Sequence, residues 1–322
     1  AAIDGSDVAI ISLGRKSGEA ADRNATDFYL KEGEKALIKQ VSEAYHAKGK
    51  KVVVLLDICS PIDVASWQSQ IDALVCTWQG GQESGFSVAD VLSGKVNPSG
   101  KLPMTFQINY GDAYADKNFP GEVDDKTLGA MFMWGYNKDQ AQKERKPQAN
   151  IDFTNYEEDI YVGYRYFDSF GKPVAYPFGY GLSYTTFGYS DAAVKVEGDT
   201  YTVSVKVTNK GDRAGRNVVE LFVAAPNSKK LNKPAKELRN YAKTRLLQPG
   251  ESEVVTMQLK TQDMASFNEK ASAWKTDAGR YDFLICSSAS DVEAKVSANV
   301  KAWTQKVHNV LQPNVKLNLL KR

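Results

Sequence analysis

Histidine is almost absent from this sequence of 322 residues, which contains only His46 and His308. A serine–histidine–aspartate triad, or a metal site built from several histidines, is therefore nearly excluded. The three cysteines, Cys59, Cys76 and Cys286, each lie within an apolar run, and we expect buried free thiols rather than a disulfide framework. Any acid–base chemistry must then rest on carboxylates.

Excess charge and long hydrophobic runs are also missing. Lys and Arg number 41 against 39 Asp and Glu, a formal net charge of +2, so we expect neither a nucleic-acid nor a membrane partner. No stretch approaches the roughly 18 apolar residues that span a bilayer. The hydrophobic share of 42% is typical of a globular protein with a sizeable core, and the length favours two domains.

Apolar runs and helical patterns alternate in the first part of the chain. Residues 7–14, 51–58 and 72–78 are continuous apolar runs of the kind found in strands buried on both faces. Between the first two runs, the apolar residues of 30–48 recur at helical spacing, and residues 61–70 predict a second, short helix. Alternation of strand and helix implies parallel strands in a doubly wound α/β layer.

Ligands of such sheets bind outside the carboxyl ends of the strands. Three loops are expected at that edge: residues 15–24, 59–61 and 79–85. The first loop is the longest and most polar, and it contains Glu19. Glu83 in the third loop is a rival carboxylate, but it lies near the N-terminus of a predicted helix over residues 83–92, and capping or inter-domain bonding explains it without catalysis.

The end of the chain has the pattern of a β-sandwich. Short strands with partial alternation are separated by turn signals, and they cover residues 200–209, 217–225, 251–259, 280–288 and 293–300. We therefore predict the fold class α/β followed by all-β. The predicted domains are an α/β domain over 1–188 with a long loop insertion around 109–158, a β-sandwich over 189–300, and a tail over 301–322.

Four segments together resemble glycoside hydrolase family 3, and the overall pattern is most similar to its bacterial β-glucosidases. They are residues 51–67 (KVVVLLDICSPIDVASW), 78–106, 156–168 and 176–190. The resemblance implies that the first domain is the C-terminal part of the family's α/β sandwich domain and that the second is its fibronectin-III-like domain. The family's (β/α)8 barrel, which carries an aspartate nucleophile, has no counterpart in this sequence.

The resemblance also implies a function. It places the general acid/base at Glu19, in the segment GRKSGEAADR over residues 14–23, and it implies a retaining exo-β-glycosidase, chiefly a β-glucosidase that hydrolyses terminal non-reducing β-D-glucosyl residues. Such hydrolysis uses two carboxyl groups and water, so no cofactor and no metal are expected. Substrate contacts are expected from Arg15 and, by stacking on sugar rings, from Trp134 and Tyr136.

The missing nucleophile limits what the chain does alone. We expect the isolated chain to be inactive and to need a barrel-bearing chain or domain as partner, with a β-glucoside or oligosaccharide as substrate. A homodimer is left open. The alternative function is a non-catalytic carbohydrate-binding or scaffolding fragment, whereas nucleotide binding is disfavoured because no glycine-rich phosphate motif follows a strand. We expect a periplasmic or secreted location, with a cytoplasmic location as the alternative.

Overall fold

The computed structural model describes residues 3–16, 25–118, 155–313 and 315–322. The chain divides into two compact units. The first is formed by Ala1–Leu92 and Phe106–Tyr156, and the second by Ser93–Thr105 and Glu157–Arg322. The first unit is α/β, and the second consists mainly of strands, so the predicted fold class is confirmed.

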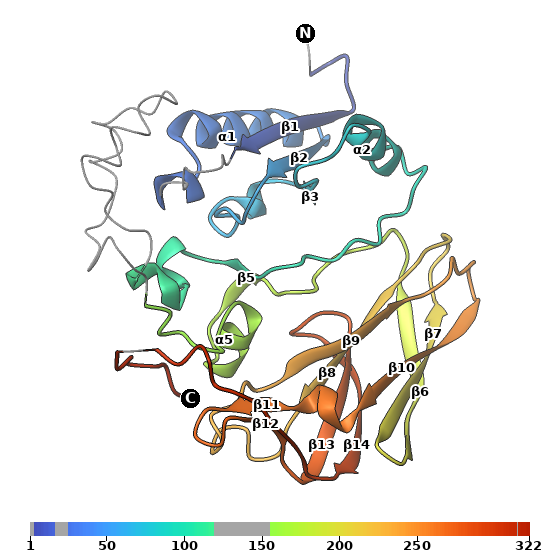
Figure 1. Ribbon diagram of the computed structural model, residues 1–322. Helices are drawn as coiled ribbons and strands as arrows, with labels where there is room; N and C mark the ends of the chain where they lie inside the picture. Colours follow the sequence, from blue (N-terminus) through green and yellow to red (C-terminus); the bar gives the residue numbers. More distant parts are fainter. Residues whose placement is uncertain (1–2, 17–24, 119–154, 314) are drawn as a thin grey trace. The chain divides into compact units, whose positions relative to one another are not determined.

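The first unit is built on a parallel sheet of three strands in the order β1–β2–β3 (Figure 1). β1 spans Val8–Arg15, β2 spans Lys51–Ile58 and β3 spans Ala73–Cys76. The helix α1, over Glu32–His46, connects β1 to β2, and α2, over Ser84–Leu92, follows β3. These elements confirm the alternation of strand and helix that the sequence predicts.

Alternation along β1 gives the sheet one buried and one open face. Ile11 and Leu13 are buried, whereas Val8 and Ile10, which point to the opposite face, are 43% and 55% exposed. The buried face packs against α1, whose Ile38 is fully buried. The prediction of burial on both faces is therefore wrong for β1, because the described residues leave its second face uncovered.

The segment after β2 is a turn rather than the helix predicted over residues 61–70. Only a short 3₁₀ helix, η2, forms at its end, over Gln68–Gln70. The Asp63 carboxylate accepts hydrogen bonds from the backbone N–H of Ser66, at 3.1 Å, and from the Ser66 hydroxyl. The Trp67 indole N–H donates to the Asp63 carbonyl. These local bonds compete with helical ones, which explains the failed prediction.

Several short helices and strands lie outside the main sheets of the two units. They are η1 Ala25–Phe28, η3 Tyr110–Asp112, η4 Tyr114–Lys117, η5 Thr261–Met264, the helix α5 Tyr164–Ser169, and the strands β4 Phe106–Gln107 and β5 Val174–Tyr176. Most of the predicted insertion, residues 119–154, lies outside the described residues. Within the part that is described, no helix has the length and apolar character needed to cross a membrane.

The second unit contains a β-sandwich of two antiparallel sheets, ordered β10–β7–β6 and β14–β13–β8–β9, and a smaller sheet ordered β11–β12–β15 (Figure 1). The strands are β6 Phe187–Glu197, β7 Thr200–Asn209, β8 Val218–Ala224, β9 Glu237–Lys243, β10 Ser252–Lys260, β11 Ser266–Asn268, β12 Ala273–Thr276, β13 Gly279–Cys286, β14 Val292–Val300 and β15 Trp303–Lys306. The five predicted strands correspond to β7, β8, β10, β13 and β14, and β15 lies in the predicted tail.

The core of the second unit lies between the two large sheets. Val203, Val205 and Val207 on β7 are fully buried and belong to one apolar cluster with Leu221 on β8 and Phe283 on β13. Every second residue of β7 faces this core, as a period of two requires. Burying one such aliphatic side chain stabilises the fold by about 1.5–3 kcal/mol. Because all these residues belong to the second unit, this unit has a hydrophobic core of its own.

Asn209, the last residue of β7, uses every hydrogen-bonding site of its amide. Its Nδ2 group donates to the carbonyls of Arg213 and Leu247, at 2.7 and 2.9 Å. Its Oδ1 accepts from the Thr185 hydroxyl at 2.6 Å and from the Gly211 N–H at 3.1 Å. The two N–H donors and the two acceptor sites of the amide are therefore all satisfied. The side chain is fully buried, so water cannot take the place of a partner that is lost.

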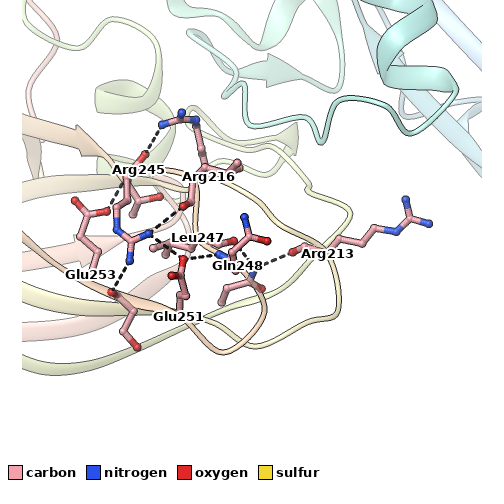
Figure 2. A network of polar contacts seen from close by, with 11 residues as sticks. Arg213, Arg216, Arg245, Leu247, Gln248, Glu251 and Glu253 are labelled. Atoms are coloured by element: carbon pink, nitrogen blue, oxygen red, sulfur yellow. Dashed lines mark hydrogen bonds and ion pairs between the residues drawn. The ribbon is translucent and has the colours of Figure 1, made fainter.

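Arginine–carboxylate contacts hold the neighbouring loop between β9 and β10 (Figure 2). The Arg245 guanidinium binds Glu251 Oε2 at 2.9 Å, and the same oxygen accepts the Gln248 N–H at 2.8 Å. Glu253 accepts the backbone N–H of Arg245 at 2.7 Å. The guanidinium of Arg213 points away from this network (Figure 2). Because these contacts are exposed, they add less stability than the buried Asn209 amide.

Replacing Asn209 with Ala should therefore lower the free energy of unfolding by about 2–4 kcal/mol, because four polar groups lose their partner, those of Thr185 and Leu247 in buried residues. The matched control is Arg245→Ala, which removes an exposed ion pair and should cost no more than about 1 kcal/mol. Urea unfolding of the full chain, followed by circular dichroism, measures both. Equal losses of stability in the two variants would contradict this account of Asn209.

A buried carboxyl group, Glu220 on β8, lies against a glycine of the segment between β5 and β6. Its side chain is 3% exposed overall, and among the described residues its Oε2 has no hydrogen-bond partner. A Cβ added at Gly179 would lie 2.3 Å from the carboxylate oxygens, so only glycine fits there. Burial raises the pKa of Glu220 to about 7, and the positive charge of Lys101 opposes the shift.

The raised pKa of Glu220 predicts a pH-dependent stability. A carboxyl that binds its proton more tightly when folded loses stability as pH rises from its unfolded pKa, 4.5, to its folded pKa of about 7. Glu220→Gln stays neutral, so its stability relative to the original chain should rise by up to about 3 kcal/mol across that range. Unfolding free energies at pH 4.5, 6 and 7.5 test this, and a pH-independent difference would contradict it.

Candidate active site at the carboxyl edge of the parallel sheet

The candidate site lies where the three parallel strands of the first unit end. Parallel strands present their carboxyl ends at one edge, which is where α/β sheets bind ligands. In the described chain, the segments that follow β1, β2 and β3 at this edge are residues 25–31, 59–67 and 77–84. The contacts among these segments decide how well the edge can position a reactive side chain.

Arg15, the last residue of β1, makes the densest set of contacts at this edge. Its Nε donates to the Asp27 carbonyl at 3.0 Å, its Nη1 to the Gly14 carbonyl at 2.9 Å, and its Nη2 to the Tyr29 carbonyl at 3.2 Å. The two remaining N–H groups bind the two carboxylate oxygens of Glu34, each at 2.7 Å. All five donors of the guanidinium are thereby used within the protein.

The electrostatics of the Arg15–Glu34 pair keep both side chains charged. Glu34 lies in the first turn of α1, and its Oε2 also accepts the backbone N–H of Lys31 at 2.8 Å. The hydrogen bond from Arg15 lowers the pKa of Glu34, and the same bond raises the pKa of Arg15. The pair therefore stays ionised at neutral pH, and its two charges cancel.

A second set of contacts joins residues 25–29 to the rest of the edge. The Asp63 N–H donates to the Phe28 carbonyl at 2.7 Å, which links the segment after β2 to η1. The buried Phe28 ring contacts the rings of Tyr29 and Tyr110 edge-on, at centroid distances of 5.1 and 6.0 Å. The Tyr110 N–H donates to the Tyr29 hydroxyl at 3.2 Å. Backbone and aromatic contacts thus hold this segment in place.

The segment after β3 turns sharply. Thr77 donates from its N–H and its hydroxyl to the Leu56 carbonyl of β2, at 2.9 and 3.0 Å. Trp78 follows with φ of 53°, a conformation uncommon for a bulky residue, and its ring contacts Phe106 edge-on at 5.9 Å. A strained backbone of this kind persists only where the surrounding structure holds it in place. Such residues are found most often at active sites and ligand-binding sites.

The family model described as the glycosyl hydrolase family 3 C-terminal domain matches residues 1–184, more than half of the chain. The chain belongs to glycoside hydrolase family 3. A second model, the fibronectin type III-like domain, matches residues 217–289, within the predicted sandwich domain. Both matches confirm the resemblance that the sequence motifs carry.

The chain resembles enzymes of this family over most of its own length. It is 43% identical to a solved structure of β-glucosidase 3B from Thermotoga neapolitana in complex with glucose, with a TM-score of 0.83, over 95% of this chain and 39% of that one. β-Glucosidase A of Butyrivibrio fibrisolvens is 37% identical over 88% of this chain and 36% of the relative. An exo-α-(1→6)-L-arabinopyranosidase of Bifidobacterium breve is 33% identical over 90% and 34%.

The chain therefore spans about a third of the length of the curated family 3 relatives that it matches. It aligns with a region that includes the family's C-terminal domain, as the sequence predicts.

Of the four predicted site residues of this family 3 chain, the structure describes Arg15. It lies at the carboxyl edge, but its donors are all engaged, so contact with a sugar would require breaking an existing hydrogen bond. Glu19, Trp134 and Tyr136 lie outside the described residues, and their roles stay predictions. Glu34 is missing from the sequence analysis, although a glutamate at the third helical position is a recognisable capping signal.

The other candidate groups have structural explanations. Glu83 is exposed, and its carbonyl accepts the N–H and the hydroxyl of Ser87 in the first turn of α2. The three cysteines are free thiols. Cys286 is buried as expected, whereas Cys59 and Cys76 are half-buried, and desolvation raises the pKa of Cys76 to about 11. Within the described ranges, no group of three or more His, Cys, Asp or Glu side chains is arranged to hold a metal ion.

Proposed function

We propose that the chain is the acid/base-bearing C-terminal part of a retaining exo-acting β-glucosidase that removes terminal non-reducing β-D-glucosyl residues. The observation that supports this most strongly is the likeness of 95% of the chain to a glucose-bound β-glucosidase, of which it covers only 39%. A glucoside is favoured over an arabinopyranoside as substrate, because identity to that structure is 43%, against 33% for the arabinopyranosidase.

In this proposal Glu19 is the proton donor. Retaining glycosidases use two carboxyl groups about 5–5.5 Å apart. One attacks the anomeric carbon as nucleophile, and the other protonates the departing oxygen and later takes a proton from the water that releases the sugar. Glu19 supplies the second carboxyl from the segment that follows β1. The nucleophile is an aspartate of the (β/α)8 barrel, which lies outside this chain.

The open face of β1 supports the proposal of a barrel-bearing partner. In the described chain, β1 is an edge strand that pairs only with β2. Its exposed face carries Val8 and Ile10, both more than 40% exposed. An unpaired strand edge beside exposed apolar side chains favours association. We therefore propose that the barrel-bearing part of the enzyme, or the chain leading from it, covers this surface.

Glu19→Gln tests the acid role in the complete enzyme, with the barrel-bearing part present. It should lower kcat/KM for cellobiose by about 100-fold or more, since general acid catalysis contributes about 10²–10⁴-fold. The kcat/KM for 2,4-dinitrophenyl β-glucoside should fall much less, because this leaving group departs without a proton. Azide should raise turnover of Glu19→Ala on the same substrate, because it attacks the glycosyl intermediate without a base.

The matched control for Glu19 is Glu83→Gln, a second glutamate in a loop at the same sheet edge. Because Glu83 is exposed and serves as a backbone partner of α2, this variant should retain the kcat/KM values of the original enzyme on both substrates. Equal losses of Glu19→Gln on the two substrates, or an unchanged rate on cellobiose, would refute the acid role.

Ile10→Lys tests the proposed partner surface. A lysine at this position would remove an aliphatic contact from the proposed interface and bring a charge into it, so the Kd for the separately produced barrel polypeptide should rise by about 10-fold or more. Val254→Lys is the control, because Val254 is an exposed apolar residue on β10 of the other unit, at 62% exposure. Calorimetric titration measures both, and equal Kd values for the two variants would contradict the assignment.

A further inference from the structure

The Arg15 guanidinium binds backbone carbonyls on both sides of the segment that carries Glu19. The segment covers residues 16–24, and it follows Arg15 directly. On one side of it, Nη1 holds the Gly14 carbonyl of β1. On the other side, Nε and Nη2 hold the carbonyls of Asp27 and Tyr29. A single side chain therefore sets the distance between the point where the segment leaves the framework and the point where it returns.

Glu34 fixes the guanidinium in turn. Its carboxylate binds Nη1 and Nη2 at 2.7 Å, while the first turn of α1 holds the carboxylate. The two side chains are 6% and 22% exposed, so water competes little for these bonds. Only arginine offers five donors in a rigid plane, and a lysine in the same place has three donors on one flexible nitrogen.

Net stability explains this arrangement poorly. Removing two charges from water is costly, and well-packed apolar residues often replace a partly buried ion pair without loss of stability. Direct substrate binding is also a poor explanation, because no guanidinium N–H of Arg15 is left for a sugar. The five hydrogen bonds of Arg15 do, however, fix the positions of the groups that they join.

We propose that Arg15 is a positioning residue for the acid/base Glu19, acting by fixing where residues 16–24 leave and rejoin the framework. The inference rests on the proposed function. A general acid has to stand within hydrogen-bond reach of the departing oxygen, and a displacement of about 1 Å costs on the order of 100-fold in rate. In this proposal Arg15 contacts neither the substrate nor the reacting atoms, and it acts only through the segment that it precedes.

The test compares two substrates in the complete enzyme. Arg15→Met should lower kcat/KM for cellobiose by about 10- to 100-fold, because the acid is misplaced. It should change kcat/KM for 2,4-dinitrophenyl β-glucoside by less than about threefold, because this leaving group needs no acid. Azide should raise the turnover of Arg15→Met on the second substrate. Arg15→Lys, which keeps the charge but not the fork, should lie between Arg15→Met and the original enzyme.

Asp72→Asn is the matched control, because Asp72 makes a comparable network at the opposite edge of the same sheet. Its carboxylate binds Lys51 Nζ at 2.7 Å, the Val52 N–H at 2.8 Å and His46 Nε2 at 2.9 Å. Its loss should destabilise the unit and leave the ratio of the two kcat/KM values unchanged. A role of Arg15 in stability alone would give the same result for Arg15→Met.

The outcomes separate this inference from the proposed function. If Glu19→Gln changes the ratio of the two kcat/KM values and the Arg15 variants do not, the positioning role is overturned and the proposed function stands. If Glu19→Gln also leaves the ratio unchanged, both are overturned. Should Arg15→Met fail to fold, Arg15→Lys and Glu34→Gln carry the test, and an unchanged ratio in both would overturn the positioning role.

Discussion

The bidentate pair between Arg15 and Glu34 is the interaction on which the candidate site depends. It joins the end of β1, the carbonyls of Asp27 and Tyr29, and the first turn of α1 in one cluster. Losing one partner of such a pair leaves the other charge uncompensated in a partly dry environment, which costs more than the pair contributes. The cluster therefore favours a single arrangement of the sheet edge. Its main effect is to fix the relative positions of these backbone segments, and its net contribution to stability is small.

The two units distribute their apolar surface in different ways. The β-sandwich closes its core between two sheets, with β7, β8, β10 and β13 all contributing buried residues. The parallel sheet buries one face on α1 and leaves Val8 and Ile10 exposed on β1. A unit with an open apolar face gains stability when a partner covers it, because binding to the folded state shifts the folding equilibrium. Under the proposed function, binding of the barrel-bearing part would therefore also stabilise this unit.

Local patterns in the sequence predict most of this fold, and the failures have separate physical causes. β7 is predicted at its observed bounds because its alternation matches one buried face. The helix predicted over residues 61–70 fails because the Asp63 side chain binds the backbone locally. β9 is missed because its sequence, ELRNYAK, lacks apolar alternation at a sheet edge. In the site, strand order predicts the position of Arg15, but Glu34 lies 19 residues away on another element, and no local pattern encodes their pairing.

Cancellation of charge within the pair bears directly on the proton transfer proposed for Glu19. A general acid has to keep its proton near neutral pH, and an unpaired cation nearby would lower its pKa by stabilising the carboxylate. Arg15 precedes Glu19 by four positions, so a free guanidinium at the end of β1 would oppose the acid role. Bound to Glu34, whose pKa it lowers, Arg15 has its counter-charge beside it. In the proposed arrangement, the pair flanks the segment without making the proposed acid, Glu19, a poorer proton donor, which an unpaired lysine or arginine at this position would do.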